Sequence, residues 1–297
     1  MTSAAIVLIL FSAVLHAGWN LISKSGKPSS LFFLIINVST ILLWMPFLFA
    51  NLAGIILIPL KFWYLLLATG FFQTLYYSGL AQAYHHGDIS LVYPLIRSIP
   101  VVLVPLVCHI LNIGEALSDM ALFGMLLIGI GCILIPVKSF KTWHFRDYWG
   151  PAMFWVIPGA LGTVGYTIID SEAIKLLNEN SFSLPVSIIY SGLLNIAIFP
   201  WLLSVVICIT GWKGIIEYRG KKILTPIAAG VALTLSYLLV LASMKLVSNV
   251  SYVAGFRQLS IPLGLFFGAI FLKEKIYLPR LLGSAIIVTG LVMTAVF

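Results

Sequence analysis

Two arginines, Arg97 and Arg257, lie within long apolar stretches of the chain. Arg97 follows Ser90 by seven residues, and Arg257 follows Ser251 by six. A helix rises about 1.5 Å per residue, so each side chain is expected about 10 Å inside its helix. A charge held deep in a bilayer costs about 2.5–3.5 kcal/mol on insertion scales, so it marks a transport pathway or has a partner. Two roles stay open: binding an acidic group of a substrate, or bonding freed carbonyls and internal partners.

Acidic partners for these arginines are scarce. The chain holds nine Asp and Glu residues, and only Asp170 is expected well inside an apolar stretch. Two buried arginines against one buried carboxylate would leave positive charge in the interior. Asp170 has an equally plausible alternative as a membrane-surface acid near Glu172 and Lys175.

The first apolar stretch carries His16, Trp19 and Asn20 on neighbouring positions of one helix face, because residues three and four apart are adjacent on a helix. This polar and aromatic face should point inward. A buried histidine is more often a helix–helix hydrogen-bonding group than a proton carrier. The other candidate substrate-binding residues flank the arginines or lie at similar depth: Gln73, Tyr76, Tyr77, Tyr93, Tyr166, Tyr237, Tyr252 and Gln258.

Several kinds of chemistry lack their sequence signatures. The chain has no His-Glu-x-x-His pattern, no Walker motif and no pair of deep aspartates. The three cysteines lie in apolar stretches without metal-ligand spacing. We therefore expect no catalytic residues, no metal and no cofactor, and we favour a carrier over an intramembrane enzyme. A channel or scaffold is the third class, but no repeated pore loop is visible.

Composition indicates what surrounds these residues. Of the 297 residues, 61% are hydrophobic and only 9% charged, against about 25% charged in a soluble domain. The mean hydropathy is +1.10. The basic residues, which give a net charge of +8, lie in short clusters between apolar runs, a membrane pattern rather than a nucleic-acid-binding one. The sequence predicts a polytopic membrane protein whose surroundings are the lipid bilayer.

Ten segments are long and apolar enough to be membrane helices, which need about 20 residues. The first is not expected to be a cleaved signal peptide, because its charges follow the apolar run. The ten segments are 4–23, 30–50, 61–85, 90–111, 118–137, 150–171, 183–210, 222–247, 249–272 and 276–297.

The distribution of Lys and Arg predicts an orientation. Loops after odd-numbered spans hold twelve of these residues, whereas loops after even-numbered spans hold three, Lys61, Lys175 and Lys245. Positive charge accumulates on the cytoplasmic side. We therefore expect the loop at Lys138 to Arg146 in the cytoplasm and both termini outside. An even number of spans would in any case place both termini on one side.

The chain also repeats itself. Tyr93 and Tyr252, Glu115 and Glu274, and the glycine pairs Gly124/Gly131 and Gly283/Gly290 share one offset of 159 residues. The glycines seven apart, like the pair Gly264 and Gly268, predict close helix packing. The predicted halves are 1–140 and 148–297, each with five spans. Because five is odd, the second half must be inverted relative to the first. Inverted repeats are a transporter architecture that places the site at the repeat interface near mid-bilayer.

Five stretches of the sequence resemble the EamA-type bacterial transporters of the drug/metabolite transporter superfamily. They are Leu15-His-Ala-Gly-Trp-Asn20 with Lys24, His86-Gly-Asp-Ile-Ser-Leu-Val-Tyr-Pro94 with Arg97, Gly114-Glu115, Gly165-Tyr-Thr-Ile-Ile-Asp170, and Ser251-Tyr-Val-Ala with Arg257 and Glu274. The resemblance implies ten helices around a central cavity, with the last helix of each half peripheral. One feature differs: small multidrug-export relatives carry a glutamate in their first span, and this first span has no carboxylate.

Together these features predict an inner-membrane, multi-pass secondary transporter of a small polar or amphipathic metabolite. An amino acid, a nucleoside and an organic anion all stay open as the substrate. Export is the direction that the resemblance implies, and coupling to protons is left open. Neither a nucleic-acid partner nor a particular oligomeric state is indicated.

Overall fold

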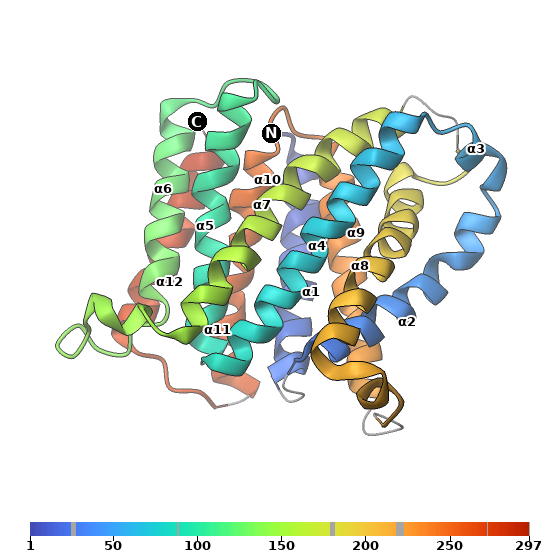
Figure 1. The fold of residues 1–297 in the computed structure, drawn as a ribbon. Coiled ribbons are helices and arrows are strands. Elements are labelled where there is room, and N and C mark those ends of the chain that lie inside the picture. The colour runs from blue at the N-terminus through green and yellow to red at the C-terminus, as the bar shows by residue number, and fades with distance from the viewer. Residues whose placement is uncertain (25–27, 88, 179–181, 218–222, 272, 297) are drawn as a thin grey trace.

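The computed structural model describes the chain except for residues 25–27, 88, 179–181, 218–222, 272 and 297. The described residues form helices and loops, with no β-strand among them. Most long helices run up and down through a single bundle, and both termini lie at the same end, called here the upper end (Figure 1). The elements are α1 (Ser3–Lys24), α2 (Ser30–Phe49), α3 (Leu52–Ile56), α4 (Leu60–His86), α5 (Ile89–Ile110), α6 (Asp119–Leu134), η1 (Phe145–Tyr148), α7 (Pro151–Leu177), α8 (Val186–Glu217), α9 (Leu224–Met244), α10 (Ser251–Phe256), η2 (Arg257–Leu259), α11 (Ser260–Phe271) and α12 (Leu278–Val296).

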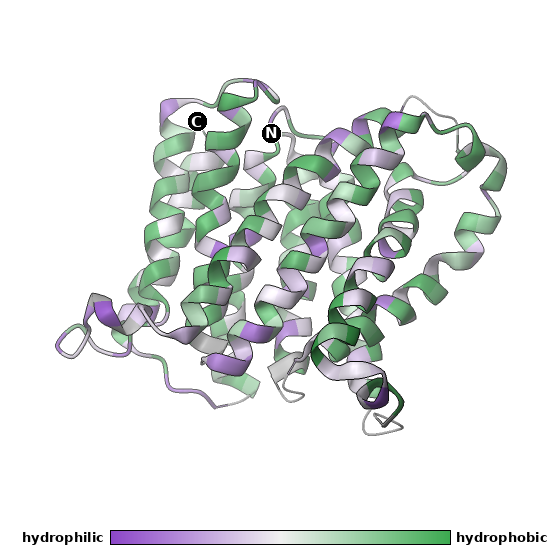
Figure 2. Cartoon of the chain, viewed as in Figure 1, coloured by the Kyte–Doolittle hydropathy of each residue, from purple (hydrophilic) through white to green (hydrophobic). Residues whose placement is uncertain are grey.

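Eight segments within the described residues are long and apolar enough to cross a membrane. Large apolar side chains point outward from the bundle, including Phe11, Leu42, Phe154 and Val292, each more than half exposed. Apolar residues cover most of the helix length, and hydrophilic residues gather more at the helix ends and loops (Figure 2). Such a surface suits hydrocarbon and not water. The chain is a multi-pass helical membrane protein.

The helices begin and end within three residues of the predicted spans, except that α7 continues to Leu177 beyond the predicted 171 and α8 continues to Glu217 beyond the predicted 210, past a non-helical Gly211. The eight segments include neither α4, whose 27 residues contain more polar groups, nor α6, which has 16 residues. The crossing of these two helices therefore stays a prediction. The apolar connector at 51–59 contains the short helix α3, which the sequence did not indicate.

The ninth predicted span is not one continuous helix. It divides into α10, the 3-10 turn η2 and α11. Pro262 explains the break, because a proline has no amide donor for the carbonyl four residues earlier, and its ring collides with that carbonyl. By contrast, α5 continues through Pro94, Pro100 and Pro105.

Glycines let α6 and α12 pack at very short distance. A Cβ atom on Gly124 would lie 2.6 Å from the carbonyl oxygen of Gly290, and one on Gly131 would lie 2.6 Å from that of Gly283. The prediction that glycines seven apart serve close packing is confirmed for these two helices. It is wrong for Gly264, around which no atom lies within 4 Å of an added Cβ, because that residue borders a cavity.

Two further antiparallel pairs build the middle of the bundle. In α4 and α7, a Cβ atom on Gly79 would lie 2.6 Å from the backbone nitrogen of Gly159. In α1 and α9, Ser12 and Ser236 each donate a hydroxyl hydrogen bond to the other's carbonyl, at 2.8 and 2.9 Å. Small residues thus bring both pairs of helices close, and the polar side chains of these helices lie inside the bundle.

Candidate functional site

Three formally charged side chains are buried at the middle of the bundle. Arg97 of α5 is 2% exposed, Arg257 of η2 is 7% exposed and Asp170 of α7 is fully buried. Their depth agrees with the sequence prediction. Their partners, however, differ sharply from one side chain to the next.

Arg97 is bonded entirely to the broken ninth span. Its Nη2 donates to the carbonyl oxygen of Arg257 at 2.6 Å and to Oγ of Ser260 at 3.3 Å, and its Nε donates to Oε1 of Gln258 at 3.0 Å. The guanidinium also lies over the Tyr93 ring, 5.9 Å from its centroid. Arg97 therefore holds α5 to the turn between α10 and α11.

Arg257 projects toward aromatic side chains instead. Its Nη2 donates to the Tyr166 hydroxyl at 3.0 Å. Its guanidinium carbon lies 5.6 Å from the centroid of the Tyr166 ring and 5.4 Å from that of Tyr237, both within cation–π range. Within the described part of the chain, Arg257 forms no direct ion pair with Asp170.

The carboxylate of Asp170 is surrounded by hydroxyl groups from three other helices, α4, α8 and α9. Its Oδ1 accepts hydrogen bonds from Thr69 and from Tyr190, the latter at 2.6 Å, and its Oδ2 accepts one from Tyr237. The complete burial of Asp170 favours the interior position over that of a membrane-surface acid beside Glu172 and Lys175. Those two residues form their own exposed pair at 2.6 Å, one turn further along α7.

A central cavity of about 570 Å³, including space open to its surroundings, lies next to Arg257. Helices from both predicted halves border it. Its lining is His16, Ile36, Thr40, Gln73, Tyr76, Tyr77, Tyr166, Leu194, Asn195, Ile198, Leu233, Thr234, Ser236, Tyr237, Val240 and Arg257. Arg257 is the one formally charged residue in this lining, and the ring nitrogen Nε2 of His16 is buried without a hydrogen-bond partner.

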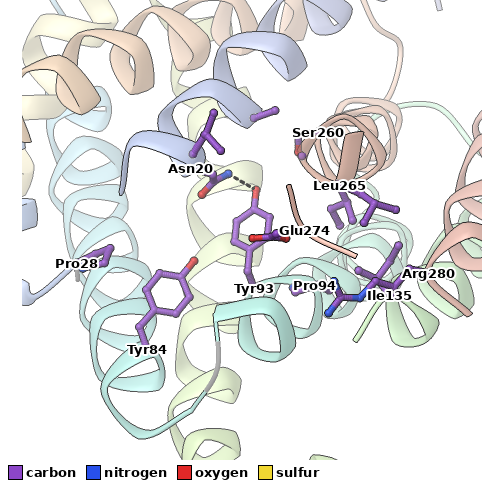
Figure 3. A pocket seen from close by; sticks show the side chains of 14 residues that line it. Asn20, Pro28, Tyr84, Tyr93, Pro94, Ile135, Ser260, Leu265, Glu274 and Arg280 are labelled. Carbon is purple, nitrogen blue, oxygen red and sulfur yellow. Dashed lines mark hydrogen bonds between the residues drawn. The ribbon is translucent and has the colours of Figure 1, made fainter. Parts of the chain in front are cut away.

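A second cavity of about 760 Å³, again including space open to its surroundings, lies toward the lower end, because residues near the lower ends of α1 and α4 border it. Figure 3 shows its lining. It is bordered by loop residues of that end, Pro28 and Glu274, and by helix residues that include Tyr84, Tyr93 and Arg280. In Figure 3 the Tyr93 hydroxyl accepts a hydrogen bond from Nδ2 of Asn20 at 2.9 Å. This space is called here the lower cavity.

The two cavities have separate linings but lie close together in the bundle. In α1, His16 borders the central cavity and Asn20, one turn further along, borders the lower one. The Tyr93 ring stacks on His16 with centroids 6.3 Å apart, while its hydroxyl bonds Asn20. Arg97 bonds the carbonyl oxygen of Arg257, which borders the central cavity, and Oγ of Ser260, which borders the lower one. Tyr93 and Arg97 of α5 therefore contact residues of both linings.

The structure brings together most of the predicted site residues, but at several places. Seven of the fourteen border the central cavity: His16, Gln73, Tyr76, Tyr77, Tyr166, Tyr237 and Arg257. Asn20 and Tyr93 border the lower one. The other five border neither cavity. Trp19 packs edge-on against His16, and Arg97 and Gln258 bond each other. Asp170 accepts a hydrogen bond from the Tyr237 hydroxyl, and Tyr252 packs against the apolar core.

Sequence reasoning missed the contribution of α2 and α8. Thr40 of α2 donates a hydrogen bond to Oδ1 of Asn195 of α8 at 2.7 Å, and both border the central cavity. Thr69 and Tyr190, which bond Asp170, were also missed. One available signal was the single amide Asn195 within the apolar run of α8. Isolated hydroxyl residues in apolar helices are too common to single out.

No protein-family model and no curated protein matches the chain. A crystal structure described only as "Crystal structure of protein" is similar to it over 99% of this chain and 96% of that one, with a TM-score of 0.72 and 14% sequence identity. At that identity the similarity is one of fold alone. Among the described residues, no three His, Cys, Asp or Glu side chains are grouped so as to hold a metal ion.

Proposed function

We propose that this protein is a secondary transporter that moves a small polar or amphipathic metabolite by alternating access, with export as the direction. The observation that carries the proposal is the pair of neighbouring cavities in one bundle whose linings share no residue, with His16 of α1 bordering one and Asn20 the other. A carrier needs side chains that close one side of its site from the other, because the site must never be open to both sides at once. We place the protein in the inner membrane and in the EamA-type group that the sequence resembles.

We further propose ten membrane helices arranged as two inverted repeats, 1–140 and 148–297. The helix contacts support this arrangement. If α1, α2, α4 and α6 are exchanged with α7, α8, α9 and α12, the contact of α4 with α7 becomes that of α9 with α1. The contacts of α2 with α8 and of α6 with α12 are unchanged. A pattern that survives the exchange is expected of a pseudo-two-fold axis through the middle of the bundle.

Cysteine labelling tests the alternation. In a variant without Cys108, Cys132 and Cys208, single cysteines at Asn20 and Thr40 would report on the lower and central cavities. Each variant is treated with a membrane-impermeant maleimide from one side at a time, with and without a mixture of candidate metabolites. Ligands should change the labelling of the two positions in opposite directions. Constant labelling of both from both sides would indicate an open channel and contradict the proposal.

Orientation and flux have separate tests. The Lys and Arg distribution predicts that the lower end faces the cytoplasm, so a C-terminal reporter active only in the cytoplasm should be silent. Saturable counterflow in proteoliposomes would distinguish a carrier from a channel. Conversion of a metabolite without flux would favour the intramembrane-enzyme alternative.

A further inference from the structure

The charges around the central cavity do not balance. Arg97 and Arg257 supply two positive charges at mid-bundle, and Asp170 supplies one negative charge. Asp170 is bonded to three hydroxyl groups and does not border the cavity, so it offers no surface to a ligand. The cavity itself therefore presents one cation, Arg257, in surroundings where an uncompensated charge is costly.

The two arginines differ in the donor groups that they have left. Nε and Nη2 of Arg97 both donate hydrogen bonds to the segment 257–260, so these donors are already occupied within the protein. The guanidinium of Arg257 donates a hydrogen bond from Nη2 to the Tyr166 hydroxyl. A guanidinium has five N–H donors in a fixed fork, which matches a carboxylate. Arg257 thus keeps donors for a ligand at the edge of an enclosed space.

The rest of the lining indicates the body of that ligand. Tyr166 and Tyr237 lie against the guanidinium, and Tyr76 contacts Tyr166 edge-on with ring centroids 5.8 Å apart. Five aliphatic side chains complete much of the wall: Ile36, Leu194, Ile198, Leu233 and Val240. The lining also offers polar groups, among them the unpartnered Nε2 of buried His16 and the amide of Gln73. Thr40 and Asn195 already satisfy each other.

We propose that the central cavity binds an organic monocarboxylate, with Arg257 bonding the carboxylate and the tyrosine and aliphatic wall holding an apolar or aromatic body. A single negative charge offsets the single excess positive charge, whereas a phosphate dianion would reverse the imbalance. This inference rests on the proposed function, because it names the substrate class of the same site.

The test is binding to the full-length protein purified in detergent. The probes are phenylacetate, indole-3-acetate and hexanoate, each paired with its neutral amide, and the readouts are thermal shift and equilibrium binding. A carboxylate that binds only the folded state should raise the unfolding temperature, whereas its amide should have at least tenfold weaker affinity. Arg257→Gln should reduce carboxylate affinity at least 100-fold. Arg257→Lys should reduce it about tenfold, because an ammonium is a point charge without the fork.

Arg146→Gln is the matched control, since it removes one exposed charge, far from the central cavity's lining, from η1 and should leave binding unchanged. Monodisperse elution of each variant establishes folding, and Arg257→Lys serves if Arg257→Gln does not fold. Equal affinity for acids and amides, no binding of any carboxylate at millimolar concentration, or normal affinity in the Arg257 variants would overturn the inference.

The inference and the proposed function can fail separately. Carboxylate binding at Arg257 without counterflow in proteoliposomes would retain the site and reject the transporter. Saturable counterflow of neutral or cationic metabolites without carboxylate binding would retain the transporter and reject this substrate class.

Discussion

Arg97 and Arg257 occupy corresponding positions in the two predicted halves, yet they have different surroundings. Arg97 lies on α5, which is continuous, and its guanidinium reaches the broken span. Arg257 lies in the break itself, and its guanidinium reaches the cavity. The break supplies backbone and side-chain acceptors to one arginine only. Two residues at matching positions of an internal repeat can therefore have different partners, because the helix is broken in one copy and continuous in the other.

The largest effect that this comparison predicts is on stability at Arg97. Arg97→Gln should remove charged hydrogen bonds to three residues, and such bonds contribute about 1.5–3 kcal/mol each. We expect a loss of about 3 kcal/mol or more in the free energy of unfolding, measured by thermal unfolding in detergent. Normal stability would contradict the role of Arg97 as the bond between α5 and η2.

The second effect concerns the hydroxyl groups around Asp170. Tyr237→Phe removes the hydroxyl that bonds Oδ2 of Asp170 but keeps the ring against Arg257. A hydrogen bond to a charged group contributes about 1.5–3 kcal/mol, so the unfolding free energy should fall by about 2 kcal/mol. Tyr277→Phe, in the loop before α12, is the control. Equal effects of the two changes would mean that Asp170 does not depend on Tyr237.

The third effect should be small, and it sharpens the contrast between the arginines. Arg257→Gln loses one hydrogen bond and two cation–π contacts but relieves an uncompensated charge. The ligand-free unfolding free energy should change by no more than about 1 kcal/mol in either direction. A loss as large as that of Arg97→Gln would show that both arginines are structural.

The smallest effect is a coupling between Arg97 and the break. Pro262→Ala restores an amide donor four residues after Gln258 and should favour a more continuous helix. The cost of Arg97→Gln should then fall by about 0.5–1 kcal/mol in a double-mutant cycle, because a more regular helix would let the Ile261 amide bond the Arg257 carbonyl that Arg97 now bonds. If the two changes in unfolding free energy are strictly additive, the contribution of Arg97 to stability does not depend on the proline-induced break.

The sequence allowed accurate prediction wherever a local pattern was sufficient. Helix bounds agreed to within a few residues for most spans, because apolar runs bounded by charged or glycine-containing loops define them. Gly124 and Gly131 were correctly assigned to packing from their spacing alone. The site was only partly predictable, since polar residues in apolar helices identify the interior of the bundle but not which cavity each one borders.

Tyr252 illustrates the limit. The repeat pairs it with Tyr93, yet Tyr93 bonds Asn20 at the lower cavity while Tyr252 packs against the core. Thr40 and Asn195 were missed for a related reason, because residues 155 positions apart meet only through the packing of α2 on α8. Side-chain direction depends on neighbouring helices that the local sequence does not encode.

The amino-acid sequence by itself determined the class of protein, the helical segments and the depth of the charged residues, because all three depend on short-range hydrophobicity and helix length. Only the tertiary structure decided the partners of those charges. Arg97 bonds residues about 160 positions away, and Asp170 is bonded by hydroxyl groups from α4, α8 and α9. A buried polar group must satisfy its hydrogen bonds wherever the fold brings donors and acceptors within reach, and that choice is made by packing between distant segments.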